Sequence, residues 1–335
     1  MRVGINGMGR IGRAYLRRSL QTTGLEVVSV NDLTDPATLA NLLRHDSTFG
    51  PFPAEIRSAG DAVVVDGRKI PVSQGSIPAE IPWADHGVEV VIEATGRFRS
   101  RATVAPHLDS GVPSVIVSAP GKGLDATIVL GVNDHVYDPI RHRLVSNASC
   151  TTNCVAPMVK VLHEAFGVER GFMTTVHAYT NDQHLLDGPH HDPRRARAGG
   201  VNIIPTSTGA AKAVGEVLPE HAGRLDGVSL RVPVTDGSMV DLGVLLDRSV
   251  SVVDVNDAFA AAAAAGPLAG LLRYADEPLV SSDVILDDSS CVFDSQLTQV
   301  SGRFVKVFGW YDNEWGYTCR LVDLTTLVAN RENER

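Results

Sequence analysis

The chain has 335 residues, of which 44% are apolar and 21% are charged, and its formal net charge is −9. This length predicts two domains, the acidic balance disfavours nucleic acid as a partner, and no apolar run is long enough to span a membrane. The N-terminus lacks the pattern of a secretory signal, and the four cysteines show neither disulfide nor zinc spacing. We therefore expect a cytoplasmic protein with two domains and no metal site.

Residues 2–20 predict a short buried strand, a glycine turn and an amphipathic helix. The turn carries Gly7, Gly9 and Gly12 in a G-x-G-x-x-G array, which permits a tight turn, close approach of a pyrophosphate and close packing of helix on strand. The next strand ends at Asp32, 20 positions after Gly12. A carboxylate there accepts hydrogen bonds from the adenosine ribose and repels a 2′-phosphate. The pattern therefore predicts a Rossmann-type site for NAD rather than NADP.

Three further apolar runs, residues 88–96, 113–120 and 126–133, end in small or polar residues. Strands of a parallel sheet buried on both faces have this composition, and their carboxyl ends form the ligand crevice. Thr95, Gly96 and Ser118 are therefore candidate cofactor contacts, although spacing alone supports plain turn residues equally well.

The segment "SNASCTTNC" places Cys150 just after residues that favour a helix N-cap. In the first turn of a helix, free N–H groups and the helix dipole lower the pKa of a thiol and stabilise its thiolate. Cys150 is therefore predicted to be a nucleophile, whereas Cys154, one turn later, reads as a buried small apolar residue. The expected partner is a base. His177 lies in a strand-like run, where a histidine is more often part of the core.

Several longer motifs resemble the phosphorylating, NAD-dependent glyceraldehyde-3-phosphate dehydrogenase family of glycolysis, in the family's order and over almost the whole chain. They are "INGMGRIGR", "ASCTTNC", "TTVHAYTNDQ", "RRARAGGVNIIPTSTGAAKAVG", "RVPVTDGSMVDL" and "WYDNEWGY". The resemblance implies that Cys150 attacks the aldehyde to form a thiohemiacetal, and that phosphate attacks the thioester left after oxidation. It also implies that His177 is the base, whereas the strand-like run around His177 alone favours a core residue.

The same resemblance implies two anion sites near the nucleophile. Thr180, Asp182 and Arg231 match the site for the C3 phosphate of glyceraldehyde 3-phosphate. Ser149, Thr151, Thr208 and Gly209 match the site for inorganic phosphate, with Arg195 close to one of the two. Hydroxyls, backbone N–H groups and guanidinium groups are suitable donors to phosphate oxygens.

The remaining implications concern the cofactor and the assembly. Arg10 and Ile11 match the cofactor-binding glycine turn, and Asn313 resembles the residue that fixes the nicotinamide amide. Residues 180–201 match the family's S-loop, which lines a neighbouring subunit's cofactor pocket and implies a homotetramer. The tract Val234–Gly237 departs from the family's commoner residues, as do Gly188, His191 and Pro193 in the S-loop.

The expected fold class is α/β, with a Rossmann doubly wound NAD domain (residues 1–148) and an α+β catalytic domain (149–312) built on a mostly antiparallel sheet. Residues 313–335 are expected to form a C-terminal helix that packs back on the NAD domain. Two alternatives to the expected function remain: a dehydrogenase of erythrose 4-phosphate, which releases its product by hydrolysis, and a catalytically silent NAD-binding relative.

Overall fold

The computed structural model describes residues 1–333, which fall into two compact units. The first unit comprises Met1–Ile128, His135–Ala148 and the chain from Thr318 on, and the second comprises Val129–Asp134 and Ser149–Tyr317. The predicted domains differ in two places: they put Val129–Asp134 in the first domain, and they begin the C-terminal segment at residue 313 rather than at Thr318. No helix among the described residues is both long enough and apolar enough to cross a membrane.

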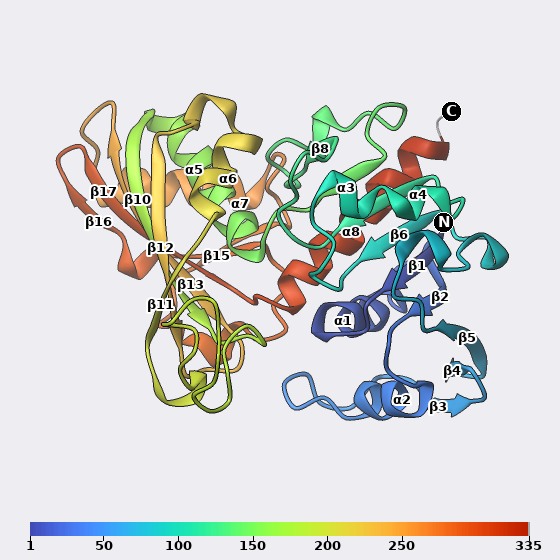
Figure 1. Cartoon of the computed structure of the whole chain (residues 1–335). Coiled ribbons are helices and arrows are strands. Elements are labelled where there is room, and N and C mark those ends of the chain that lie inside the picture. The colour runs from blue at the N-terminus through green and yellow to red at the C-terminus, as the bar shows by residue number, and fades with distance from the viewer. Residues whose placement is uncertain (334–335) are drawn as a thin grey trace. The chain divides into compact units, whose positions relative to one another are not determined.

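The first unit is built on a nine-stranded sheet in the order β3-β4-β5-β2-β1-β6-β7-β9-β8 (Figure 1). All neighbouring pairs from β5 to β8 are parallel, and β3-β4 and β4-β5 are antiparallel. The strands are β1 Arg2–Asn6, β2 Glu26–Asn31, β3 Ile56–Ala59, β4 Ala62–Val65, β5 Arg68–Ser73, β6 Val90–Glu93, β7 Ser114–Val117, β8 Ala126–Thr127 and β9 Leu144–Ser146. The helices are α1 Arg10–Ser19, α2 Pro36–Arg44, α3 Arg101–Val104, α4 Pro106–Asp109 and α8 Trp315–Asn333.

One predicted strand, residues 126–133, is much shorter than expected. Only Ala126–Thr127 pairs in the sheet. Beyond it, the Asn133 side chain accepts the N–H of Val129, and Asp134 accepts the N–H of Gly131. These local bonds turn the chain out of the ladder, because Asn and Asp side chains compete with strand pairing for backbone donors.

The second unit contains a mixed sheet in the order β11-β12-β10-β13-β17-β15-β14, with β16 paired to β17. Its strands are β10 Val168–Ala178, β11 Ile204–Ser207, β12 Leu225–Val232, β13 Ser238–Leu246, β14 Leu272–Ala275, β15 Cys291–Asp294, β16 Gln299–Ser301 and β17 Phe304–Tyr311. Only β10-β12 and β14-β15 are parallel. The expected fold class, a parallel nucleotide-binding sheet plus a mostly antiparallel second sheet, is therefore confirmed.

Helix α5, Cys150–Phe166, lies against β10, β13, β15 and β17, with α6 Ala210–Val217 and α7 Val252–Ala264 beside it (Figure 1). The side chains of α5 from Thr151 to Val159 are all buried. The apolar contacts of this helix with the sheet hold its first residue, Cys150, over the end of β10.

Helix α8 begins at Trp315, two residues later than the predicted Asn313. The Asp312 carboxylate accepts the N–H groups of Glu314 and Trp315, which satisfies donors at the start of this helix. From Thr318 on, α8 belongs to the first unit, where Tyr15 of α1 donates to the Thr325 hydroxyl over 2.9 Å.

Candidate functional site

The nucleophile candidate occupies the first position of α5. Ser149 is the N-cap, and its hydroxyl accepts the N–H of Thr152 at 3.0 Å. Cys150 is half-buried, whereas Cys154, Cys291 and Cys319 are buried. Cys150 is therefore the thiol that a reactant can reach, at a helix end where backbone N–H groups are oriented toward an incoming oxyanion.

The structure brings Cys150 and His177 together although 27 positions separate them. Sγ of Cys150 lies 3.4 Å from Nε2 of His177, which sits near the end of β10. The other ring nitrogen, Nδ1, is 2.7 Å from the carbonyl oxygen of Ala178 and 2.8 Å from Nη1 of Arg231. A thiol, a base within hydrogen-bonding reach and a group that orients the base are the elements of an activated nucleophile.

Burial and a neighbouring cation determine the charge states of this pair. Burial, reinforced by Arg231, lowers the pKa of His177 to about 3. Burial also raises the pKa of the Cys150 thiol, and Arg231 offsets part of that rise. The helix N-terminus alone predicts a lowered pKa for this thiol, whereas its buried surroundings raise the pKa. Both shifts favour the uncharged forms of the two groups, and Nε2 lies where it can accept the thiol proton when the thiolate forms.

A chain of buried hydroxyl groups begins at Thr151, the residue after the nucleophile. Oγ1 of Thr151 lies 2.8 Å from the Tyr311 hydroxyl, which lies 2.8 Å from Oγ1 of Thr175, and Thr175 donates to the Met239 carbonyl. Because Thr175 donates onward, Tyr311 donates to Thr175 and Thr151 donates to Tyr311. The Thr151 hydroxyl is thus committed to the interior, and a role in phosphate binding would fall to its backbone N–H. Nothing in the sequence pattern pointed to Tyr311, which comes from β17.

The predicted anion-binding residues in the S-loop and just after it already have partners within the second unit. Arg195 forms an ion pair with Asp182, and its Nη2 lies 3.4 Å from the Ser207 carbonyl. The N–H of Thr180 donates to Oε1 of Gln183, a buried residue that sequence reasoning missed. Thr208 accepts the N–H of Ala210, and Gly209 is the N-cap of α6. The phosphate-binding roles of these residues stay predictions.

Asn313 lies in the second unit and is buried. Ser238 donates to its Oδ1 at 2.6 Å and accepts the N–H of Ala178, the residue after the candidate base. The nearby Asp236 is buried: its Oδ1 accepts the N–H of Gly237, and its Oδ2 has no hydrogen-bond partner among the described residues. Burial, together with the charges of Asp312 and Glu314, raises the pKa of Asp236 to about 9, so this carboxyl group holds a proton at neutral pH.

A pocket of about 250 Å³ lies at the carboxyl ends of β1, β2 and β6, and four predicted cofactor residues line it, namely Gly7, Gly9, Asp32 and Thr95. Gly7, with φ of 95°, and Gly12 are sterically required, since a Cβ on Gly12 would lie 2.0 Å from the Gly7 carbonyl oxygen. A Cβ on Gly9 would meet no described atom within 4 Å, so the backbone is open to a ligand there. These features fit a dinucleotide pyrophosphate at the start of α1.

Asp32 is fixed at the edge of the same pocket. Its two oxygens accept the N–H groups of Met8 at 2.6 Å and Thr34 at 2.9 Å, which leaves lone pairs for ribose hydroxyls. Thr95 also lines the pocket and Gly96 follows it, with φ of 70°. Arg10 instead pairs with Asp46 and stacks on Phe49.

Two further cofactor candidates are not among the residues that line this pocket. Ile11 follows in the first turn of α1, and Ser118 follows β7, where its N–H donates to the Glu93 carbonyl. Their contact with a cofactor stays a prediction.

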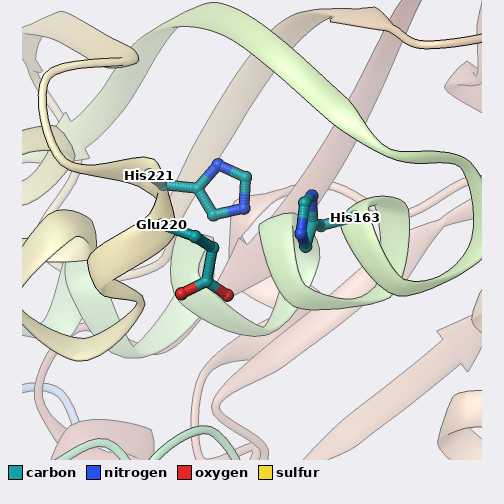
Figure 2. A group of neighbouring side chains, drawn as sticks. All are labelled: His163, Glu220 and His221. Atoms are coloured by element: carbon teal, nitrogen blue, oxygen red, sulfur yellow. The ribbon is translucent and has the colours of Figure 1, made fainter.

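A separate cluster of ionisable side chains, His163, Glu220 and His221, lies elsewhere in the second unit (Figure 2). Among the described residues, neither ring nitrogen of the buried His221 has a hydrogen-bond partner. However, Nδ1 of His163 accepts the N–H of Val168, and the two imidazole rings are perpendicular, at 88°, with centroids 4.4 Å apart. The edge of the His221 ring faces the His163 ring plane (Figure 2), so their lone pairs do not converge on one point as a metal requires.

Comparisons with known proteins agree across both units. Residues 1–101 match the model of the NAD binding domain of glyceraldehyde 3-phosphate dehydrogenase, and residues 149–313 match that of its C-terminal domain. The chain is 56% identical over 331 residues to glyceraldehyde-3-phosphate dehydrogenase 2 of Streptomyces arenae, covering 98% of this chain and 99% of the relative. It is 55% identical to the enzyme of Streptomyces coelicolor (99% of each chain) and 54% identical to that of Mycobacterium bovis (98% of each). The chain therefore belongs to the glyceraldehyde-3-phosphate dehydrogenase family.

Proposed function

We propose that this protein is the NAD-dependent glyceraldehyde-3-phosphate dehydrogenase of glycolysis and that it works by the phosphorylating route. The observation that carries the mechanism is the 3.4 Å contact between Sγ of Cys150 and Nε2 of His177 at the start of α5. Sequence identity of 54–56% over nearly the full length of three dehydrogenases of this name supports the activity.

The chemistry of the chain's own groups follows from that contact. His177 takes the thiol proton, and the Cys150 sulfur forms a bond to the aldehyde carbon, which gives a thiohemiacetal. The backbone N–H of Cys150 and the protonated His177 stabilise the oxygen of this intermediate. When bound, NAD supplies the acceptor for the hydride lost from the aldehyde carbon.

Release of the product is the step that needs phosphate. The acyl group remains on Cys150 as a thioester, and an oxygen of inorganic phosphate attacks its carbonyl carbon. The carbon–sulfur bond breaks, the thiolate leaves, and 1,3-bisphosphoglycerate departs. Ser149, the backbone N–H of Thr151, Thr208, Gly209 and Arg195 are the groups proposed to hold the attacking phosphate. Thr180, Asp182 and Arg231 are those proposed to hold the C3 phosphate of the substrate.

Residues of the first unit supply the proposed cofactor site: the turn from Gly7 to Gly12, the Asp32 carboxylate and the loop at Thr95 and Gly96. Asn313 is proposed to bind the nicotinamide amide. The exposed leucines Leu185 and Leu186 of the S-loop, 89% and 77% exposed in the single chain, support assembly into the proposed homotetramer. We place the enzyme in the cytoplasm.

The decisive assay measures NADH formation from glyceraldehyde 3-phosphate, with and without inorganic phosphate, beside erythrose 4-phosphate and NADP. The proposed function predicts sustained turnover only with phosphate and a preference for NAD and glyceraldehyde 3-phosphate. Phosphate-independent turnover that favours erythrose 4-phosphate would instead assign the hydrolytic relative. Binding of NAD without turnover of either sugar phosphate would point to a silent relative.

A further inference from the structure

Glu93, the last residue of β6, is a buried carboxylate beneath the cofactor pocket. It is 1% exposed and accepts four hydrogen bonds, two on each oxygen. Oε1 accepts the backbone N–H and the hydroxyl of Thr95, and Oε2 accepts Nδ2 of Asn6 at 2.6 Å and Nε2 of His107 at 3.0 Å. Four donors match the four lone-pair sites of an ionised carboxylate.

The donor role of His107 is set by Trp83. The indole N–H of Trp83 can only donate, and it lies 3.2 Å from Nδ1 of His107. Nδ1 therefore carries no proton, and a neutral imidazole places its single proton on Nε2, toward Glu93. Both rings are fully buried, so the tautomer is fixed by the core of the unit and not by solvent.

Asn6, at the end of β1, links Glu93 by hydrogen bonds to Asn31 at the end of β2. Because Nδ2 of Asn6 donates to Glu93, its Oδ1 faces β2 and accepts Nδ2 of Asn31 at 2.8 Å. Asn31 in turn bonds both the N–H and the carbonyl of Gly75, at 2.8 and 2.9 Å, and its Oδ1 accepts the Ser73 hydroxyl. The ends of β1, β2 and β6 and the loop after β5 are thus tied to one carboxylate.

Four residues held by this network also line the cofactor pocket, namely Asn6, Asn31, Gly75 and Thr95. The network also defines what Thr95 can offer a ligand. Its N–H and its hydroxyl proton both point to Glu93, and its Oγ1 accepts the N–H of Arg97 at 3.1 Å. Thr95 therefore forms a wall of the pocket without donating a hydrogen bond into it.

We propose that Glu93 is a positioning residue of the dinucleotide site: its carboxylate fixes the side-chain amides of Asn6 and Asn31 and the Thr95 loop, and so sets the shape of the pocket before the cofactor binds. The inference rests on the proposed function, since it names a determinant of the same NAD site. A preorganised pocket has a lower cost of ordering on binding, which favours affinity.

The test is Glu93→Gln, which keeps the shape but places an amide NH₂ where donors converge. We expect the Kd for NAD, measured by calorimetry, and the KM for NAD to rise about tenfold or more, as for the loss of one or more hydrogen bonds. The kcat at saturating NAD should be retained, as should the alkylation rate of Cys150 without NAD, because Glu93 touches neither the nucleophile nor its base.

Trp83→Phe is the matched control, because it removes one hydrogen bond next to the network while Oε2 of Glu93, 3.0 Å from Nε2 of His107, still favours the tautomer that donates to it. It should lower the thermal unfolding temperature and leave the Kd for NAD unchanged. If Glu93→Gln does not fold, Ser73→Ala tests the far end of the network, where a smaller rise in Kd is expected.

An unchanged Kd in Glu93→Gln overturns the inference, as does an equal rise in Trp83→Phe, which would indicate general destabilisation. With the Ser73→Ala variant, an unchanged Kd has the same meaning. These outcomes differ from failure of the proposed function, in which the wild-type protein itself does not bind NAD.

Discussion

Nη1 of Arg231 lies 2.8 Å from Nδ1 of His177, the residue directly opposite it across the parallel strands β10 and β12. A guanidinium group only donates, so this contact requires a lone pair on Nδ1, whereas the Ala178 carbonyl, 2.7 Å away, requires a proton there. The two neighbours select opposite tautomers of the imidazole. Only the tautomer that donates to Ala178 leaves a lone pair on Nε2 to take the Cys150 proton.

A phosphate group bound to Arg231 would draw the guanidinium away from Nδ1 and neutralise it. Since the Arg231 charge contributes to the low pKa of His177, its neutralisation raises that pKa and strengthens the base. The same neutralisation also raises the pKa of the Cys150 thiol, so its effects on the base and on the nucleophile oppose each other.

The first prediction concerns the base. His177→Asn removes Nε2 from the Cys150 thiol, so kcat should fall roughly 10²- to 10⁴-fold, the usual contribution of a general base. The midpoint of the pH profile for Cys150 alkylation by iodoacetamide should move to higher pH, since the thiol loses its proton acceptor. An unshifted profile with a lowered kcat would indicate that His177 acts only on later steps.

Arg231→Gln separates phosphate recognition from chemistry. Loss of a charged hydrogen bond should lower kcat/KM for glyceraldehyde 3-phosphate by about 10- to 100-fold. Activity toward glyceraldehyde, which has no phosphate, should change little, because removing the cation raises the pKa of His177 and that of the Cys150 thiol, with opposite effects on proton transfer between them. Equal losses with both substrates would contradict a role in phosphate binding.

Tyr311→Phe tests the buried hydroxyl chain. The change leaves the Thr151 and Thr175 hydroxyls without their shared partner inside the second unit, which costs about 1–3 kcal/mol of unfolding free energy. Urea denaturation of the wild type and the variant gives this difference. Since Thr151 adjoins the nucleophile, kcat should also fall, and a variant as stable as the wild type would refute the hydrogen-bond assignment.

Asp236→Asn tests the proton held beside Asn313. The pKa of Asp236 is raised by burial to about 9, above an unfolded value of about 3.9, so the folded state binds the extra proton between these limits. This contribution to stability is fully present below about pH 4 and is lost as the pH rises through about 9.

The amide variant has no proton to lose. The wild type should therefore lose more thermal stability than Asp236→Asn between pH 5 and pH 9, and this difference is measured by calorimetry at both values. Parallel pH dependences in the two proteins would show that Asp236 is ionised in the folded state.

The parts of the site that depend on local geometry were predictable from the sequence. The spacing of Gly7, Gly9, Gly12 and Asp32 requires no knowledge of distant residues, because a strand, a turn and a helix place them at one pocket. The start of α5 at Cys150 follows in the same way from the N-cap preference of Ser149.

Contacts made across the fold were not predictable in this way. Tyr311 meets Thr151 across 160 positions, and Glu93 meets Asn6 across 87, with no periodic pattern to reveal either pair. The direction of the thiol pKa was also wrong from local reasoning, because a helix N-terminus lowers the pKa and burial of Cys150 raises it. His177 in its strand became a catalytic candidate only through the family resemblance.

The most direct test of the account is a rapid-mixing experiment with glyceraldehyde 3-phosphate and NAD in the absence of inorganic phosphate. A covalent mechanism through Cys150 predicts a burst of one NADH per functional site, an acyl group on Cys150 detected by mass spectrometry after acid quench, and its release on addition of phosphate. Cys150→Ser should show no burst. Continuous NADH formation without phosphate, or a burst that survives in Cys150→Ser, would contradict the account.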